Sequence, residues 1–128
     1  MNKQITDEQV ADLLADSARY IEENGWTRHE LRIDHAVCTV GAMLYSQKLD
    51  VTEPIHTQPL VIAGCQALVN GLGLDLPDFP FTNVRMDLRM INAVTEWNDD
   101  QVEDVQTILD ALRKVEKIER NGGVDPDE

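Results

Sequence analysis

Apolar residues recur at three- and four-residue steps through five segments of this chain, and turn-forming residues separate the segments. This spacing gives a helix one buried face and one exposed face. The last segment shows it most clearly, with Val102, Val105, Ile108, Leu109, Leu112, Val115 and Ile118 ahead of Asn121-Gly122-Gly123. No segment alternates for long enough to form a strand ladder. The sequence therefore predicts an all-α fold, a compact bundle of about five helices.

Polar residues with capping chemistry predict where the first two helices begin and end. Thr6-Asp7-Glu8-Gln9 has the spacing of a capping box, and Asn24-Gly25 supplies a helix stop. The segment from Trp26 to Ile33 has no helical stripe, so we expect a loop or a short extended piece. Asp34 is predicted to cap the second helix, which should end near Lys48.

Similar signals predict the three later helices. Thr57, ahead of Gln58 and Pro59, is predicted to cap the third helix, and Gly71 or Gly73 to end it. Thr82 or Asn83 is the expected cap of the fourth. The fifth helix is predicted to begin at Asp100-Gln101-Val102-Glu103, which repeats the capping-box spacing.

The length of the chain predicts one domain. A chain of 128 residues with 42% hydrophobic residues can bury a sizeable core. We expect that domain to span residues 1–123, followed by an acidic tail, 124–128. The longest apolar stretch, Leu60–Ala63, is far shorter than the ~20 residues that cross a bilayer. The first residues show no signal peptide. We therefore expect a cytoplasmic protein with no membrane partner.

The charge balance restricts the classes of partner. The chain has 24 acidic residues against 11 lysines and arginines, a formal net charge of -13. Such a chain repels phosphate backbones, which argues against direct nucleic-acid binding. The same charge attracts basic proteins. The oligomeric state stays open.

Three short motifs carry a resemblance to a known family. They are Gly25-Trp26, Cys38-x-x-Gly41-Ala42 and Trp97-Asn98-Asp99, in that order. Their order and spacing resemble those of a family of small uncharacterised proteins of actinobacteria and their phages. The resemblance implies a small helical fold and a phage or host-chromosome context, with no activity attached. Where the family usually has a turn residue before the cysteine, this chain has Asp34-His35-Ala36-Val37, so its entry to the second helix is expected to differ.

The glycine of the second motif predicts close helix packing. A glycine inside a helix costs about 1 kcal/mol relative to alanine, which a structure recovers where another backbone approaches closely. We expect Gly41, beside Ala42, to face Gly64 of the third helix, so that the two helix axes cross at short distance. The alternative is a ligand pocket over the bare backbone.

The third motif is expected to start the last helix. Trp97 would pack on the core as an anchor, while Asn98, Asp99 or Asp100 would accept the first free backbone N–H groups. Two alternatives remain, a divalent-cation site and an acidic docking surface.

Two cysteines and three histidines are the soft ligands of the chain. His35-x-x-Cys38 would share one helical face, and His56 and Cys65 could complete a tetrahedral zinc site. Alternatively, Cys38 at a helix start could act as a nucleophile, with a histidine as its base. Both cysteines lie among apolar residues, which favours buried, inert thiols. We therefore expect no metal and no cofactor.

The sequence favours a non-enzymatic protein-interaction domain with a basic protein partner, such as a phage accessory protein acting on a bacterial host protein in the host cytoplasm. One alternative is a cysteine-dependent enzyme using Cys38 with His35 or His56. A further alternative is an acidic DNA mimic that occupies a DNA-binding protein. The expected interaction surface consists of Asp99, Asp100, Glu103, Asp104, Asp110, Arg85 and Arg89.

Overall fold

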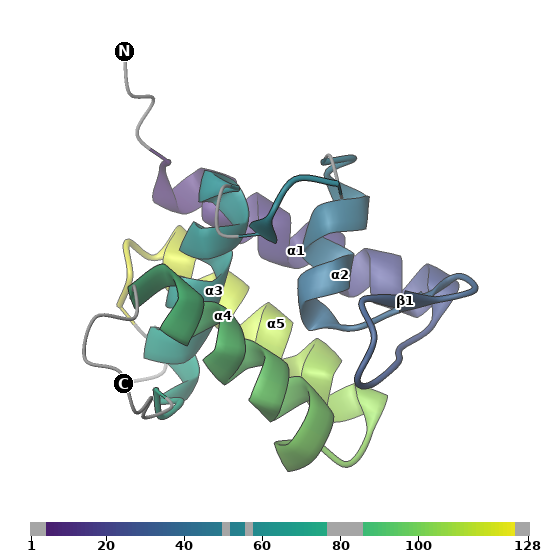
Figure 1. The fold of residues 1–128 in the computed structure, drawn as a ribbon. Coiled ribbons are helices and arrows are strands. Elements are labelled where there is room, and N and C mark those ends of the chain that lie inside the picture. Colours follow the sequence, from purple (N-terminus) through teal and green to yellow (C-terminus); the bar gives the residue numbers. More distant parts are fainter. Residues whose placement is uncertain (1–4, 50–51, 56–57, 77–85, 125–128) are drawn as a thin grey trace.

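The computed structural model describes residues 5–49, 52–55, 58–76 and 86–124. Within these ranges it contains five α-helices, one π-helical turn and one short hairpin (Figure 1). The predicted all-α bundle is confirmed, because each strand of the hairpin has only two residues. The elements are α1 (Asp7–Asn24), β1 (Arg32–Ile33), β2 (Ala36–Val37), α2 (Thr39–Ser46), α3 (Pro59–Leu72), α4 (Met86–Glu96), η2 (Trp97–Gln101) and α5 (Val105–Arg120).

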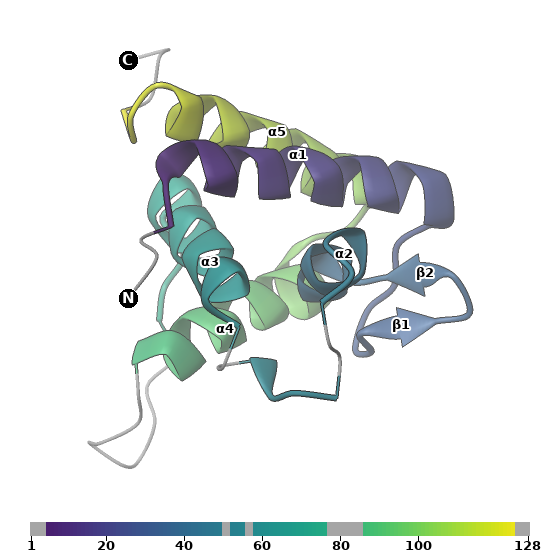
Figure 2. The same ribbon diagram turned by 90° about the horizontal axis from the view of Figure 1, so that it is seen from above.

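The first and last helices form one side of the bundle. Helices α1 and α5 lie side by side and run in opposite directions, while α2, α3 and α4 lie on their other side (Figure 2). Their apolar faces meet in one core, where the large, fully buried side chains include Leu13, Leu14, Ile21, Met43, Leu44, Leu68, Ile108 and Leu112. None of the helices in the described ranges is long and apolar enough to cross a membrane.

Both predicted ends of the first helix and the predicted stop of the third helix are confirmed, whereas the N-cap of α3 is Gln58 rather than the predicted Thr57. The Thr6 hydroxyl accepts from the Gln9 backbone N–H at 3.1 Å, and the Gln9 side chain accepts from the Thr6 N–H at 2.8 Å. These bonds satisfy donors that a helix start leaves free. Helix α1 stops at Gly25, and α3 stops at Gly73, whose φ of 64° is left-handed.

The predicted start of the second helix is wrong. Asp34 lies in the hairpin turn with a left-handed φ of 55°, and Cys38 caps α2 instead. The reason is pairing between β1 and β2, which places Arg32 opposite Val37 and Ile33 opposite Ala36. Residues committed to that ladder cannot also form a helical turn. The expected extended piece before Asp34 is confirmed, but it continues as a hairpin.

The predicted start of the last helix is also wrong. Asp100 lies inside η2, a π-helical turn that continues α4, so the third motif ends one helix rather than starting another. The N-cap of α5 is Asp104, whose carboxylate accepts from the Thr107 N–H and from the Thr107 hydroxyl, both at 2.9 Å. These two bonds lower the pKa of Asp104.

The expected contact between Gly41 and Gly64 is wrong, although both glycines mark close approaches. A Cβ atom at Gly41 would lie 2.1 Å from the backbone oxygen of Leu31, just ahead of β1. A Cβ atom at Gly64 would instead meet the side chains of Leu13, at 2.7 Å, and Met43, at 3.2 Å. Gly41 therefore lets the hairpin, rather than α3, lie against α2.

Several predicted positions lie outside the described residues. They are the helix caps Thr57, Thr82 and Asn83, the candidate ligand and base His56, the surface residue Arg85, and residues 125–128 of the predicted tail.

Candidate functional site

The three sequence motifs meet at the buried side chain of Asn98. This residue lies in η2 and is only 1% exposed. Trp26 of the first motif follows α1, and Thr39, next to Cys38 of the second motif, begins α2. All three contribute to one hydrogen-bond network, so residues far apart in the sequence are held at one point.

The carboxamide of Asn98 uses both of its polar atoms. Its Oδ1 atom accepts from Trp26 Nε1 at 2.8 Å, from the Thr39 N–H at 3.0 Å and from Thr39 Oγ1 at 2.7 Å. Its Nδ2 atom donates to the Thr27 carbonyl oxygen at 3.2 Å and to Asp99 Oδ1 at 2.8 Å. A buried amide with this set of partners repays the cost of leaving water. Asn98 therefore joins α2 and the segment after α1 to η2.

Asp99 extends the network to the base of the hairpin. Its Oδ1 atom accepts from the His29 backbone N–H at 2.9 Å, and its Oδ2 atom lies 3.6 Å from His29 Nδ1. His29 has a left-handed φ of 68°, which this double contact helps to hold. Arg28 donates to the Val102 carbonyl oxygen, and its guanidinium lies 4.9 Å from the Trp26 ring centroid.

The hydrogen-bond network gives the polar residues of the third motif a structural role. Trp97 is buried in the core, as the anchor reading predicted, although it does not precede a helix start. The predicted capping by Asn98, Asp99 or Asp100 is wrong, because Asn98 and Asp99 bind the segments around Trp26 and Thr39 instead. Within the described ranges no three metal-binding side chains come together.

The two cysteines lie in the core. Cys38 is 6% exposed, and its sulfur accepts from the Gly41 N–H at 3.3 Å, while Cys65 on α3 is fully buried. Burial raises the pKa of the Cys38 thiol. Burial also raises the pKa of Cys65 to about 12, with a smaller contribution from Cys38. Burial therefore disfavours the thiolate form of both cysteines, and the thiolate is the form that a nucleophile needs.

The two histidines in the described ranges, His29 and His35, have partners other than Cys38. His35 lies in the exposed hairpin turn, and its Nδ1 atom is 3.5 Å from Arg32 Nη2. The expected helical face shared by His35 and Cys38 is wrong, because His35 precedes β2. His29 lies against Asp99.

Thiol reactivity checks this arrangement directly. We expect both Cys38 and Cys65 to react with 5,5′-dithiobis(2-nitrobenzoic acid) at the rate of unfolding, and rapidly only in denaturant. The cause is the combination of burial and raised thiol pKa. Measuring the labelling rate with increasing urea separates the two regimes. Rapid labelling of Cys38 in the Cys65→Ala variant without denaturant would instead favour the nucleophile reading.

Some carboxylates of the predicted acidic surface bind other groups of the domain, and others are exposed to solvent. Asp104 caps α5, Asp110 accepts from Gln106 at 2.8 Å, and Asp99 is only 11% exposed at its side chain. Asp100 and Glu103 are both exposed at the α4–α5 junction. Arg89 lies on α4, and its Nε atom is buried without a hydrogen bond in the described part of the chain.

Sequence reasoning missed four residues of the network around Asn98 and Asp99. Thr39, Thr27, Arg28 and His29 have no motif of their own, and the bonds that join them to η2 or to the residue after it span 59 to 74 residues of sequence. No local spacing signals such contacts. The short motifs identified where the hydrogen-bond network lies in the sequence, but not which residues bind each other.

Comparison with known proteins places the chain in a family. A model for a family of unknown function, DUF6197, matches residues 5–117, a range that includes all three motifs. No curated protein and no solved structure matches the chain. The expectation of an uncharacterised family is confirmed, while an actinobacterial or phage origin stays a prediction. The chain belongs to the DUF6197 family.

Proposed function

We propose that this domain acts by binding another protein, without catalysis. The observation that supports it is the contrast between the interior and the hairpin. The polar motif residues bind one another inside the fold, whereas Leu31 is 36% exposed and Ile33 is 49% exposed. Exposed apolar side chains grouped on one projection are typical of interaction surfaces.

The proposed contact surface combines the hairpin with the α4–α5 junction. We define the hairpin surface as Leu31, Ile33, Asp100 and Glu103. The hairpin projects at the end of the bundle where α2 begins (Figure 1). Its base is fastened to the junction by Arg28, which donates to the Val102 carbonyl oxygen, and by the His29–Asp99 contact. These links bring exposed apolar groups and carboxylates to the same end of the molecule.

The charge of the domain favours a basic partner. A net charge of -13 steers positively charged proteins toward the domain, and carboxylates around an apolar contact contribute to association rate and specificity. The sequence resemblance adds a context, a phage accessory protein that acts on a host protein in the cytoplasm of an actinobacterium.

The two alternative functions have less support. A cysteine enzyme needs an accessible thiolate, whereas Cys38 is buried and its pKa is raised. A DNA mimic needs acids spaced like a phosphate row. Here Asp104 is used as a helix cap, and Asp12, Glu22 and Glu116 pair with arginines. These pairings interrupt a continuous negative field.

A comparative pull-down tests the proposal. Affinity-tagged domain and its Leu31→Ser/Ile33→Ser variant are incubated with actinobacterial lysate at low and at high salt. We expect a protein that the unmodified domain retains, that the double variant loses, and that high salt weakens, because attraction between exposed charges is screened. Reversing Asp100 and Glu103 to lysine should weaken retention of the same protein.

The matched control is Met86→Ser, because Met86 is 55% exposed but lies on α4, away from the hairpin. This variant should retain the partner at the level of the unmodified domain. Equal recovery by all variants, or recovery of no specific protein, would contradict a hairpin-mediated interaction.

A further inference from the structure

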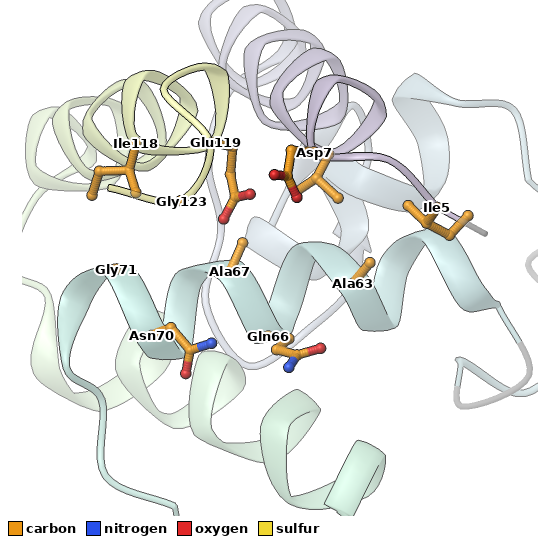
Figure 3. Close-up of a pocket in the computed structure, with 12 residues that line it drawn as sticks. Ile5, Asp7, Ala63, Gln66, Ala67, Asn70, Gly71, Ile118, Glu119 and Gly123 are labelled. Atoms are coloured by element: carbon orange, nitrogen blue, oxygen red, sulfur yellow. The ribbon is translucent and has the colours of Figure 1, made fainter. Parts of the chain in front are cut away.

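A groove at the other end of the bundle is unrelated to the motif network. It has a volume of about 540 Å³ and lies where the start of α1, one face of α3 and the end of α5 meet. Figure 3 shows that Asp7 and Glu119 point toward each other above α3, with Ala67 beneath them. Asp7 is the first residue of α1, and Glu119 lies in the last turn of α5.

The groove is lined by the carboxylates of Asp7 and Glu119, by the neutral amides Gln66 and Asn70, and by small or apolar residues. Ala63 and Ala67 form part of its α3 side, one helical turn apart, and Val10 and Ile118 contribute apolar side chains. None of the described residues that line it is basic. The nearby Arg120 guanidinium binds Asp12 at 3.0 Å and Glu116 at 2.9 Å, so it is turned to other acids. Partial burial, together with the charge of Asp7, raises the pKa of Glu119.

We propose that this groove binds a primary ammonium group carried on an unbranched alkyl chain. An ammonium is a compact charge with three donors, which suits carboxylates that approach it from two helices. Its apolar stem can lie along the alanines while the charged end reaches Asp7 and Glu119. A bound calcium ion would require six to eight oxygen ligands, and the groove offers two carboxylates.

Free aliphatic diamines and the lysine side chains of other proteins both carry a primary ammonium group on an unbranched alkyl chain. Two probes distinguish these sources, 1,5-diaminopentane and Nα-acetyl-lysine N-methylamide. Each is titrated into ¹⁵N-labelled protein at constant ionic strength, and backbone amide shifts are followed. We expect saturable shifts at Ala67, Gly71 and Glu119, and none at Leu31 or Ile33.

Two variants and a control make the test specific. Glu119→Gln and Asp7→Asn should each weaken the apparent affinity by about tenfold, because each removes one charge-assisted contact. Glu23→Gln makes the same change of charge outside the groove, at the opposite end of α1, and should leave the affinity unchanged. The amide spectrum of each variant verifies its fold.

Each result of the titrations has a different interpretation. Binding of the lysine derivative alone assigns the groove to a protein lysine, and binding of the diamine alone assigns it to a small amine. Absence of saturation with both probes, or equal shifts in Glu119→Gln and the unmodified protein, would overturn the proposal. The hairpin variants probe the other end of the molecule, so failure here is distinguishable from failure of the proposed protein-binding function.

Discussion

Replacing Asn98 with alanine should lower the free energy of unfolding by about 4 kcal/mol. The substitution removes the acceptor for Trp26 Nε1, the Thr39 N–H and the Thr39 hydroxyl, and also the donor to the Thr27 carbonyl oxygen. Buried donors left without a partner carry their full desolvation cost. Urea denaturation followed by tryptophan fluorescence measures the effect, with the slope of the transition compared between variants.

Trp26→Phe provides the matched comparison, because it keeps an aromatic ring and deletes one donor to Asn98. The expected loss is about 1 kcal/mol, the net contribution of one hydrogen bond. An Asn98→Ala variant that loses no more stability than Trp26→Phe would show that the carboxamide is not the centre of the network. Such a result would also contradict the explanation that the three motifs serve to build this buried hydrogen-bond network.

Local chemistry made part of the fold predictable. The capping box at Thr6 depends on residues three positions apart, and the glycine at position 73 supplies a left-handed φ that other residues adopt at a cost. The apolar stripe of the last helix became the buried face of α5, including Ile108, Leu112 and Val115. Each of these features is decided within one or two helical turns, so the sequence pattern contains the information.

Competing long-range contacts explain the two wrong helix starts. Asp34 and Asp100 are both good capping residues, yet Asp34 lies in a turn and Asp100 in a π-helical turn. The hairpin is held against α2 by a bond from the Cys38 N–H to the Leu31 carbonyl oxygen at 3.2 Å. The η2 turn is fixed by Asn98. Capping propensity is worth about 1 kcal/mol, less than such a set of buried contacts.

The candidate site was predictable in composition but not in arrangement. The motif residues Trp26 and Asn98 were identified from the sequence, and they form a direct hydrogen bond across 72 residues. Trp97 was expected to pack on the core and does so, whereas the assignment of Asn98 to the start of the last helix was wrong. The groove at Asp7 and Glu119 had no sequence signal, because it depends on the antiparallel placement of α1 beside α5.

Gly41→Ala should lower the free energy of unfolding by about 3 kcal/mol, although alanine is the better helix former. The added methyl group would lie 2.1 Å from the Leu31 carbonyl oxygen and 3.1 Å from its carbon. These are backbone atoms, and Leu31 also accepts from the Cys38 N–H, so the hairpin must move as a unit. Thermal and urea denaturation measure the loss, and amide shifts in residues 31–38 report the displacement.

Gly64→Ala separates this steric effect from a general intolerance of buried helical glycines. Its methyl group would meet Leu13 Cδ2 at 2.7 Å and the end of the Met43 side chain at 3.2 Å. Both are flexible side-chain ends that can adopt other rotamers, while alanine gains about 1 kcal/mol of helix propensity. We therefore expect a change within about 1 kcal/mol of zero. If Gly41→Ala is equally mild, the close contact between the hairpin and α2 does not set the position of the hairpin.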